Sequence, residues 1–133
     1  MNLNIFRRTL LAVCCLAGSS LAHAEVYVIS NSATPITAGE IKEVFTGDKQ
    51  LAGSIKLVPV DNAASQEDFL SSALKMDVSR YNTIWTKKSF RDGLTAPPVK
   101  SGDSEVLDFV RKTPGAVGYV KSQPSGVNLI QKY

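Results

Sequence analysis

Short apolar runs alternate with amphipathic segments from residue 26 to residue 131. Runs of β-branched and other apolar residues are typical of strands, whereas apolar residues three and four positions apart are typical of helices. We therefore expect strands over residues 26–29, 55–60, 116–120 and 127–131, and helices over residues 38–45, 66–74, 78–90 and 103–112. This order predicts an α/β fold, a mixed sheet flanked by helices.

Capping residues support two of the predicted helix starts and one helix end. Thr37 and Glu40 have the spacing of a capping box before the first helix. Gly47 is the residue type that most readily ends a helix, because it adopts a left-handed conformation without strain. Asp77 is placed to cap the third helix.

Two segments lack apolar periodicity and predict turns or loops. Pro59 indicates the end of the second strand or an edge position, because proline lacks an N–H for the sheet. Residues 61–65 are then expected to form a polar turn before the second helix. Residues 91–102 contain two glycines and two prolines and predict a loop.

The first 24 residues have the layout of a secretory signal peptide. Arg7 and Arg8 precede an apolar run over residues 10–17, and Ala22-His23-Ala24 is a typical cleavage motif. The apolar run is too short to span a bilayer, so we expect cleavage after Ala24 and no membrane insertion of the mature chain.

Residues 25–133 would then form one periplasmic domain, since their number fits a single domain. The alternative is a lipid anchor on Cys14 or Cys15. Bulky Val13, where a small residue would be expected, disfavours that anchor.

The residues expected to be removed include both cysteines and the only histidine. The mature domain then has no disulfide, no Cys/His zinc site, no cysteine nucleophile and no Ser-His pair. We expect a binding protein without metal or cofactor rather than an enzyme. Arg7 and Arg8 are two of the 15 basic residues, so the 12 acidic residues nearly balance the rest and nucleic-acid binding is not indicated.

Two further constellations have simple structural explanations. Ser72 and Lys75 have the Ser-x-x-Lys spacing of some hydrolases, but the companion motifs are missing and two solvated helix residues explain the pair. Arg80, Lys87 and Arg91 fall on one line of the third helix. They suit either an acidic partner or a solvated helix edge, and the small net charge favours the edge.

Two neighbouring pairs of residues on the second and third helices are interpreted in the same way. Tyr81 and Trp85 belong to the predicted buried stripe of the third helix, the alternative being that one of them lines a ligand surface. Glu67 and Asp68 are adjacent on the second helix and point in different directions, so they form no acid/base pair. Carboxylates at a helix N-terminus complement its dipole.

The junction of the second strand and second helix is the candidate ligand site. Open α/β sheets bind ligands beyond the carboxyl ends of their strands, and a helix N-terminus there offers N–H donors to an anion. The ligand-binding candidates are Asn62, Ala63, Ala64 and Ser65. The alternative is that Ser65 only caps its helix.

Three segments resemble the phosphate-binding subunits of bacterial phosphate ABC transporters and their single-lobe relatives in the type II periplasmic binding protein superfamily. The segments are residues 40–47 (EIKEVFTG), residues 57–69, and residues 113–120 (TPGAVGYV), of which the last is the most specific. The resemblance runs from about Ile36 to Val120 and implies one lobe of such a binding protein.

In that family the turn before the second helix carries a Gly-Ser-Gly-Thr phosphate loop with an arginine shortly before it. The resemblance places residues 62–65 on this loop, where only the hydroxyl of Ser65 is kept, and no arginine occurs in residues 55–74. Family members close two lobes over their ligand, whereas this chain supplies one lobe. We therefore expect it to bind an anion weakly unless a second copy or another envelope protein completes the cleft.

These observations lead to two hypotheses. The favoured one is a periplasmic solute-binding-like domain for phosphate or a related oxyanion, belonging or related to a phosphate ABC transport system. The alternative is a module that has lost its ligand and docks on an envelope sensor, transporter or assembly partner. The missing arginine and the single lobe favour the alternative.

Overall fold

The computed structural model describes residues 24–133, so the predicted signal peptide lies outside the described residues except for Ala24. The helical elements are η1 (Ala38–Glu40), α1 (Ile41–Phe45), α2 (Gln66–Phe69), η2 (Leu70–Leu74), α3 (Val78–Asp92) and α4 (Asp103–Lys112). The strands are β1 (Tyr27–Ser30), β2 (Leu51–Ala52), β3 (Ile55–Lys56), β4 (Val58–Pro59), β5 (Asp61–Asn62), β6 (Val99–Lys100), β7 (Ala116–Val120) and β8 (Asn128–Lys132).

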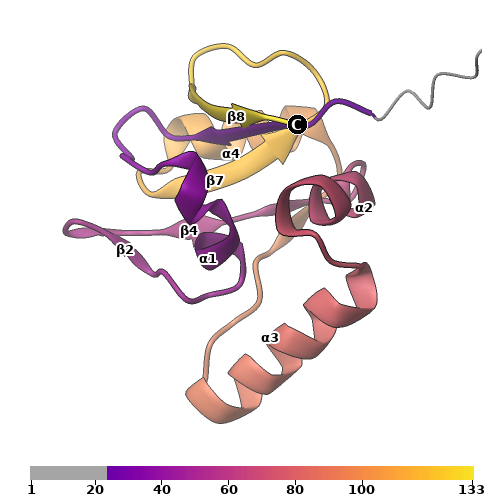
Figure 1. The fold of residues 1–133 in the computed structure, drawn as a ribbon. Helices are drawn as coiled ribbons and strands as arrows, with labels where there is room; N and C mark the ends of the chain where they lie inside the picture. Colours follow the sequence, from indigo (N-terminus) through magenta and orange to yellow (C-terminus); the bar gives the residue numbers. More distant parts are fainter. Residues whose placement is uncertain (1–23) are drawn as a thin grey trace, which may run out of the picture.

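A four-stranded mixed sheet lies at the centre of the fold, in the order β4-β7-β1-β8 (Figure 1). Strand β1 runs antiparallel to both β7 and β8, whereas β7 runs parallel to β4. Two small pairs accompany it, the antiparallel hairpin β2-β3 and the parallel pair β5-β6. The predicted mixed α/β sheet is confirmed.

Helices cover both faces of this sheet because its central strands are apolar on both sides. On one face Val28 and Tyr119 join the core with α1, α2 and η2. On the other face Ile29 and Val120 pack against α4. A Cβ at Gly118 would lie 2.7 Å from Cγ1 of Val106, so glycine in β7 lets α4 approach the sheet closely.

Several local predictions are confirmed. The Glu40 carboxylate accepts hydrogen bonds from the backbone N–H and the hydroxyl of Thr37, at 3.0 and 2.9 Å. The Asp77 carboxylate accepts the N–H of Arg80 at 2.8 Å and so caps α3. After α1, Gly47 takes a φ of 80°. The bounds of α4 and β7 agree with those predicted.

The prediction of one continuous strand over residues 55–60 is wrong. The segment changes partner twice: Ile55 pairs with Ala52, and Val58 pairs with Ala116. It then continues as β5, because Asp61 pairs with Val99. Pro59 lies at the edge of the sheet, as predicted.

The predictions for residues 61–65 and 91–102 also need correction. Asp61 and Asn62 form a buried strand rather than a polar turn, and only residues 63–65 turn. The N–H groups of Asp61 and Ala63 donate to the carbonyls of Pro98 and Lys100, both at 2.9 Å, so part of the predicted loop becomes β6. This pairing joins segments far apart in the sequence, which local patterns do not reveal.

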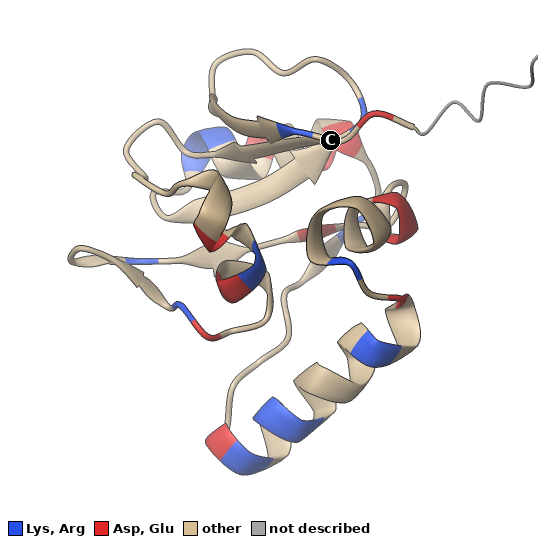
Figure 2. Cartoon of the chain, viewed as in Figure 1, with Lys and Arg blue, Asp and Glu red and all other residues tan. Residues whose placement is uncertain are grey.

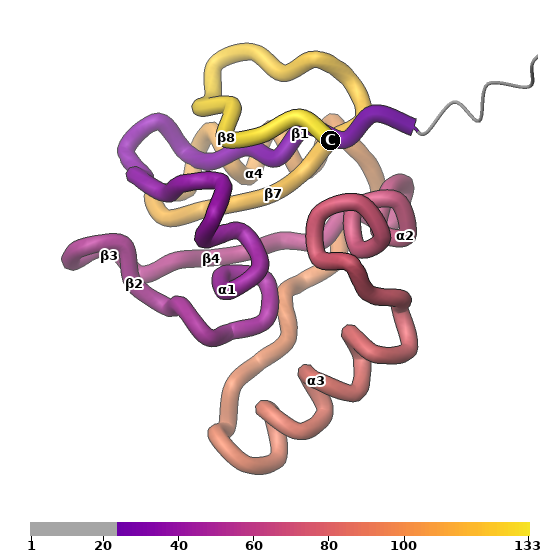
Figure 3. Tube along the Cα trace, in the orientation of Figure 1, coloured from indigo at the N-terminus to yellow at the C-terminus, as the bar shows by residue number. Residues whose placement is uncertain are grey.

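Helix α3 projects away from the sheet and returns through an extended segment (Figures 1 and 3). Of its 15 residues only Tyr81 and Trp85 are buried. Lys and Arg residues are spaced along it (Figure 2), and Arg80, Lys87 and Arg91 are exposed. Within residues 24–133 no helix is long and apolar enough to cross a membrane.

Candidate functional site

A small hollow of about 270 Å³ lies at the head of α2. It is lined by Ala63, Ala64, Ser65, Gln66, Glu67, Asp68 and Val78. The turn leaves β5 and enters α2 here, so the hollow lies where the sequence analysis expects the ligand.

The structure brings the four predicted site residues together on one turn but exposes only two of them. Ala63 and Ala64 are exposed, whereas Asn62 and Ser65 are buried. The Asn62 amide donates to a carboxylate oxygen of Asp103 at 2.8 Å and to the carbonyl of Tyr119 at 3.0 Å. Asn62 therefore ties the turn to the rest of the domain.

The backbone donors of the turn are already used within the protein. The N–H of Ala64 donates to the side-chain oxygen of Asn62, and the N–H of Ser65 donates to the Asn62 carbonyl, both at 3.1 Å. Together with the Ala63 bond to Lys100, these contacts leave no free amide in residues 63–65. The expectation that the amides of the turn are unpaired is therefore wrong for residues 63–65.

The free donors of the hollow lie one step further along the chain. The N–H groups of Gln66, Glu67 and Asp68 are the first three of the helix and have no intrahelical acceptor. The Ser65 hydroxyl occupies the N-cap position but makes no cap bond, and its Oγ is buried without a hydrogen-bond partner in the described part of the chain. The carboxylates of Glu67 and Asp68 line the same hollow and oppose an anion.

Asp103 stabilises the turn electrostatically from α4. Its carboxylate accepts the Asn62 amide and the backbone N–H groups of Lys121 and Ser122, the latter two at 3.1 Å. Partial burial acts to raise the pKa of Asp103, but these donors outweigh it and the pKa is lowered. Asp103 therefore stays ionised and holds the end of β7 against the turn.

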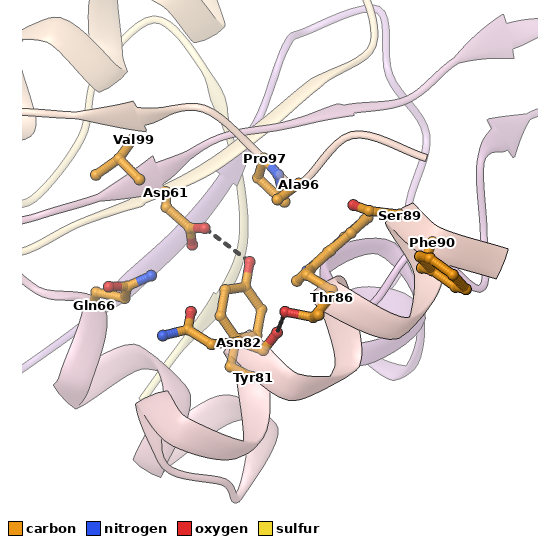
Figure 4. Close-up of a pocket in the computed structure, with 11 residues that line it drawn as sticks. Asp61, Gln66, Tyr81, Asn82, Thr86, Ser89, Phe90, Ala96, Pro97 and Val99 are labelled. Carbon is orange, nitrogen blue, oxygen red and sulfur yellow. Dashed lines mark hydrogen bonds between the residues drawn. The ribbon is translucent and has the colours of Figure 1, made fainter. Parts of the chain in front are cut away.

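A second, larger concavity of about 670 Å³ lies between α3 and the segment leading into β6 (Figure 4). It is an open groove lined by Asp61, Gln66, Tyr81, Asn82, Trp85, Thr86, Ser89, Phe90, Ala96, Pro97 and Val99. Tyr81 and Trp85 are core residues, as predicted, and both also line this groove.

Asp61 is the residue that sequence reasoning missed. Its side chain is 1% exposed, and its two carboxylate oxygens accept the hydroxyls of Tyr81 at 2.7 Å and Tyr119 at 2.8 Å. Burial raises the pKa of Asp61 despite these two donors, and burial beside Asp61 raises the pKa of both tyrosines. The available signal was an acidic residue directly after the apolar stretch Leu57 to Val60.

The hydrolase-like pair on the second helix is not assembled. Lys75 is exposed beyond the end of η2 in a left-handed conformation, with φ of 55°, and no hydrogen bond joins it to Ser72. In the described part of the chain Glu67 and Asp68 are not joined by a third acidic or metal-ligating side chain. Within residues 24–133 no group of three or more His, Cys, Asp or Glu side chains could hold a metal ion.

The fold is similar to that of a solved transport receptor. The structure is similar to an ABC-type phosphate transport receptor from Vibrio cholerae, with a TM-score of 0.52 and 20% identity. The chain has the fold of one lobe of a phosphate receptor. PstS from Borrelia burgdorferi also matches, with a TM-score of 0.42, 16% identity, and coverage of 73% of this chain and 41% of that one.

The Vibrio match covers 82% of this chain but only 47% of the receptor, so the chain spans about half of that protein. No protein-family profile and no curated protein matches the chain.

Proposed function

We propose that the protein is a periplasmic solute-binding lobe, related to phosphate transport receptors, that holds a small oxyanion such as phosphate at the head of α2. The observation that carries the proposal is the Ser65 hydroxyl, which is buried without a partner beside the first three free amides of the helix. An unsatisfied buried hydroxyl costs stability, and a bound oxyanion would supply the missing acceptor.

The orientation of α2 favours the binding of an anion in the hollow. The amides of residues 66–68 all point out of the N-terminal end, where the helix dipole is positive. The matched Vibrio protein is a phosphate transport receptor. The sequence resemblance described above implies that residues 62–65 correspond to the phosphate loop of the phosphate-binding subunits.

The charges of the hollow predict weak binding by this lobe alone. Glu67 and Asp68 line it and repel an anion, whereas none of its described lining residues is a lysine or arginine. Small ligands are usually buried over most of their surface, so a second protein surface is needed for tight binding. A second copy of the chain or an envelope partner is the proposed source of that surface.

A thermal-shift titration of the purified protein tests the proposal. Binding to the native state alone raises the melting temperature by mass action, so about 10 mM phosphate should raise it by a few degrees. Chloride at equal ionic strength is the control for general salt effects. No shift with phosphate, sulfate or related oxyanions would contradict the proposal.

The variant Ser65→Ala locates the site. Because Oγ of Ser65 is buried and makes no cap bond, its removal should leave the melting temperature of the ligand-free protein unchanged or raise it, unlike the loss of an ordinary cap. The phosphate shift should disappear. Ser71→Ala, at an exposed serine of the next helical segment, is the matched control and should keep the shift.

The exposed end of α3 favours the alternative, a protein-interaction module. Phe90 is 96% exposed, and a bare phenyl ring contributes strongly when it is buried in an interface. Phe90→Ala should then release a single defined partner that co-purifies with the wild-type protein at low salt. Leu129→Ala, at a residue that is 52% exposed on β8, is the control. A phosphate shift without a co-purifying partner would favour the solute-binding proposal.

A further inference from the structure

The groove along α3 is chemically distinct from the hollow at the head of α2. Of its described lining residues only Asp61 carries a formal charge, and the polar remainder is neutral: Gln66, Asn82, Thr86 and Ser89. The basic residues Arg80, Lys87 and Arg91 are not part of this lining. Any formal charge of the groove lining therefore resides on one buried carboxylate.

This carboxylate has no cationic partner, unlike many others on the molecule. Lysines or arginines pair with Glu25, Glu40, Asp48, Asp92 and Asp108 at the surface. Within residues 24–133 no such nitrogen lies within ion-pair distance of Asp61, although it is buried, where an unpaired charge is most costly.

Asp61 also has unused capacity to accept hydrogen bonds. A carboxylate offers about four lone-pair positions. The hydroxyls of Tyr81 and Tyr119 each occupy one, at one oxygen apiece. Figure 4 shows the carboxylate among the labelled residues of the groove, with the Tyr81 hydroxyl directed at it. The remaining positions match the donors of a small ammonium group.

Apolar and aromatic side chains form much of the rest of the groove. Tyr81, Trp85 and Phe90 belong to α3, whereas Pro97 and Val99 belong to the segment that leads into β6. Aromatic rings attract a nearby cation through their faces, and apolar walls bind a hydrocarbon body. A volume of about 670 Å³ is in the ordinary range for small-molecule sites.

We propose that this groove binds a primary amine with a small apolar or aromatic body, whose ammonium group pairs with Asp61. The groove shares Gln66 with the oxyanion hollow. The proposed contact with Asp61 does not involve that residue, so the amine site does not depend on oxyanion binding. The amine would supply the cation that the folded chain lacks at Asp61, while its body covers Trp85 and the facing segment.

The single tryptophan of the sequence reports on this groove directly. Because Trp85 lines it, titration with 2-phenylethylamine should give a saturable change in tryptophan fluorescence excited at long wavelength. The neutral analogue 2-phenylethanol should bind at least about tenfold more weakly, since it lacks the charge, and phenylacetate should not bind. An equal response to all three probes, or no saturable response to the amine, overturns the proposal.

Asp61→Asn tests the ammonium contact. The variant keeps the side-chain shape and removes the charge, so the affinity for 2-phenylethylamine should fall at least about tenfold. Asp108→Asn removes an exposed carboxylate on α4 and should leave binding unchanged. Unaltered binding by Asp61→Asn overturns the proposal.

A matched pair on α3 tests the position even if Asp61→Asn fails to fold. Thr86 and Thr83 are both exposed, and each hydroxyl donates to the carbonyl four residues earlier, at 2.8 and 3.0 Å. Only Thr86 lines the groove. Thr86→Phe should fill the groove and abolish the amine response, whereas Thr83→Phe should retain it. Equal effects of the two substitutions contradict the assigned site.

Discussion

Helices α3 and α4 are both amphipathic and both were predicted from the sequence, yet they are attached to the domain in different ways. Helix α4 has 10 residues and lies along the sheet, and its two fully buried residues, Val106 and Val110, are aliphatic and attach it by packing alone. Helix α3 is longer but buries only Tyr81 and Trp85. Its attachment is concentrated on two side chains, each with a polar anchor.

These anchors hold one helix face and leave the other open. The Trp85 Nε1–H donates to the carbonyl of Phe45 at 3.0 Å, and the Tyr81 hydroxyl donates to Asp61. Lys88 pairs with Asp48 beyond them. A helix whose apolar face is buried in the core stabilises the fold, whereas a helix held by a few side chains leaves a surface exposed for ligands or partners. The comparison assigns the first role to α4 and the second to α3.

The largest expected effect comes from Trp85→Ala. Loss of a buried aromatic side chain costs about 3–5 kcal/mol of unfolding free energy, and here it also removes the anchor to Phe45. Val110→Ala on α4 removes two methyl groups and should cost about 2 kcal/mol. Urea denaturation measures both, and hydrogen exchange should show α3 opening locally in the Trp85 variant. A smaller cost for Trp85→Ala than for Val110→Ala would contradict a concentrated attachment.

The polar anchor at Asp61 should give a smaller, pH-dependent effect. Because the folded-state pKa of Asp61 is raised above 3.8, its contribution to stability is full below that value and is lost as the pH rises through the folded pKa. Tyr81→Phe removes a donor that favours the ionised form, so the pKa should rise further. The variant should therefore lose about 1–3 kcal/mol, with a penalty that grows as the pH rises.

Unfolding midpoints of wild type and Tyr81→Phe between about pH 4 and pH 8 provide the measurement. Tyr27→Phe is the matched control, because the Tyr27 hydroxyl donates to the exposed carboxylate of Glu25 at 3.0 Å. That surface contact should contribute little. A penalty for Tyr81→Phe that shrinks as the pH rises would show that the sign assigned to Asp61 is wrong.

Phe90→Ala should give the smallest effect on stability. Its ring is 96% exposed, so truncation removes almost no packing and should change the unfolding free energy by less than about 0.5 kcal/mol. A substantial loss in the isolated protein, measured by urea denaturation, would mean that this end of α3 is packed in solution and is not available to a partner.

Local chemistry made much of the fold predictable. The capping box at Thr37, the cap at Asp77 and the uninterrupted apolar run of β7 depend on residues close in sequence, and each agrees with the structure. The strand β6 and the division of residues 55–60 into several strands were not predicted. Both depend on pairing with distant segments, whose register no local pattern encodes.

The candidate sites also combine features set by residues close in sequence with features set by distant segments. The position of the turn before α2 follows from a strand, a serine and a helix pattern in succession. The engagement of its amides follows from Lys100 and Asn62, and Lys100 is brought there only by the fold. Asp61 is an isolated acidic residue in the sequence, and its two tyrosine partners are 20 and 58 positions away.

The sequence by itself determined the apolar faces, the helix ends and the absence of cysteine and histidine from residues 24–133. These follow from side-chain size, polarity and short-range hydrogen bonding. Only the tertiary structure decided which polar groups are buried, paired or left free. It did so because burial and pairing depend on which segments meet, as the enclosed carboxylate of Asp61 and the unpartnered hydroxyl of Ser65 both illustrate.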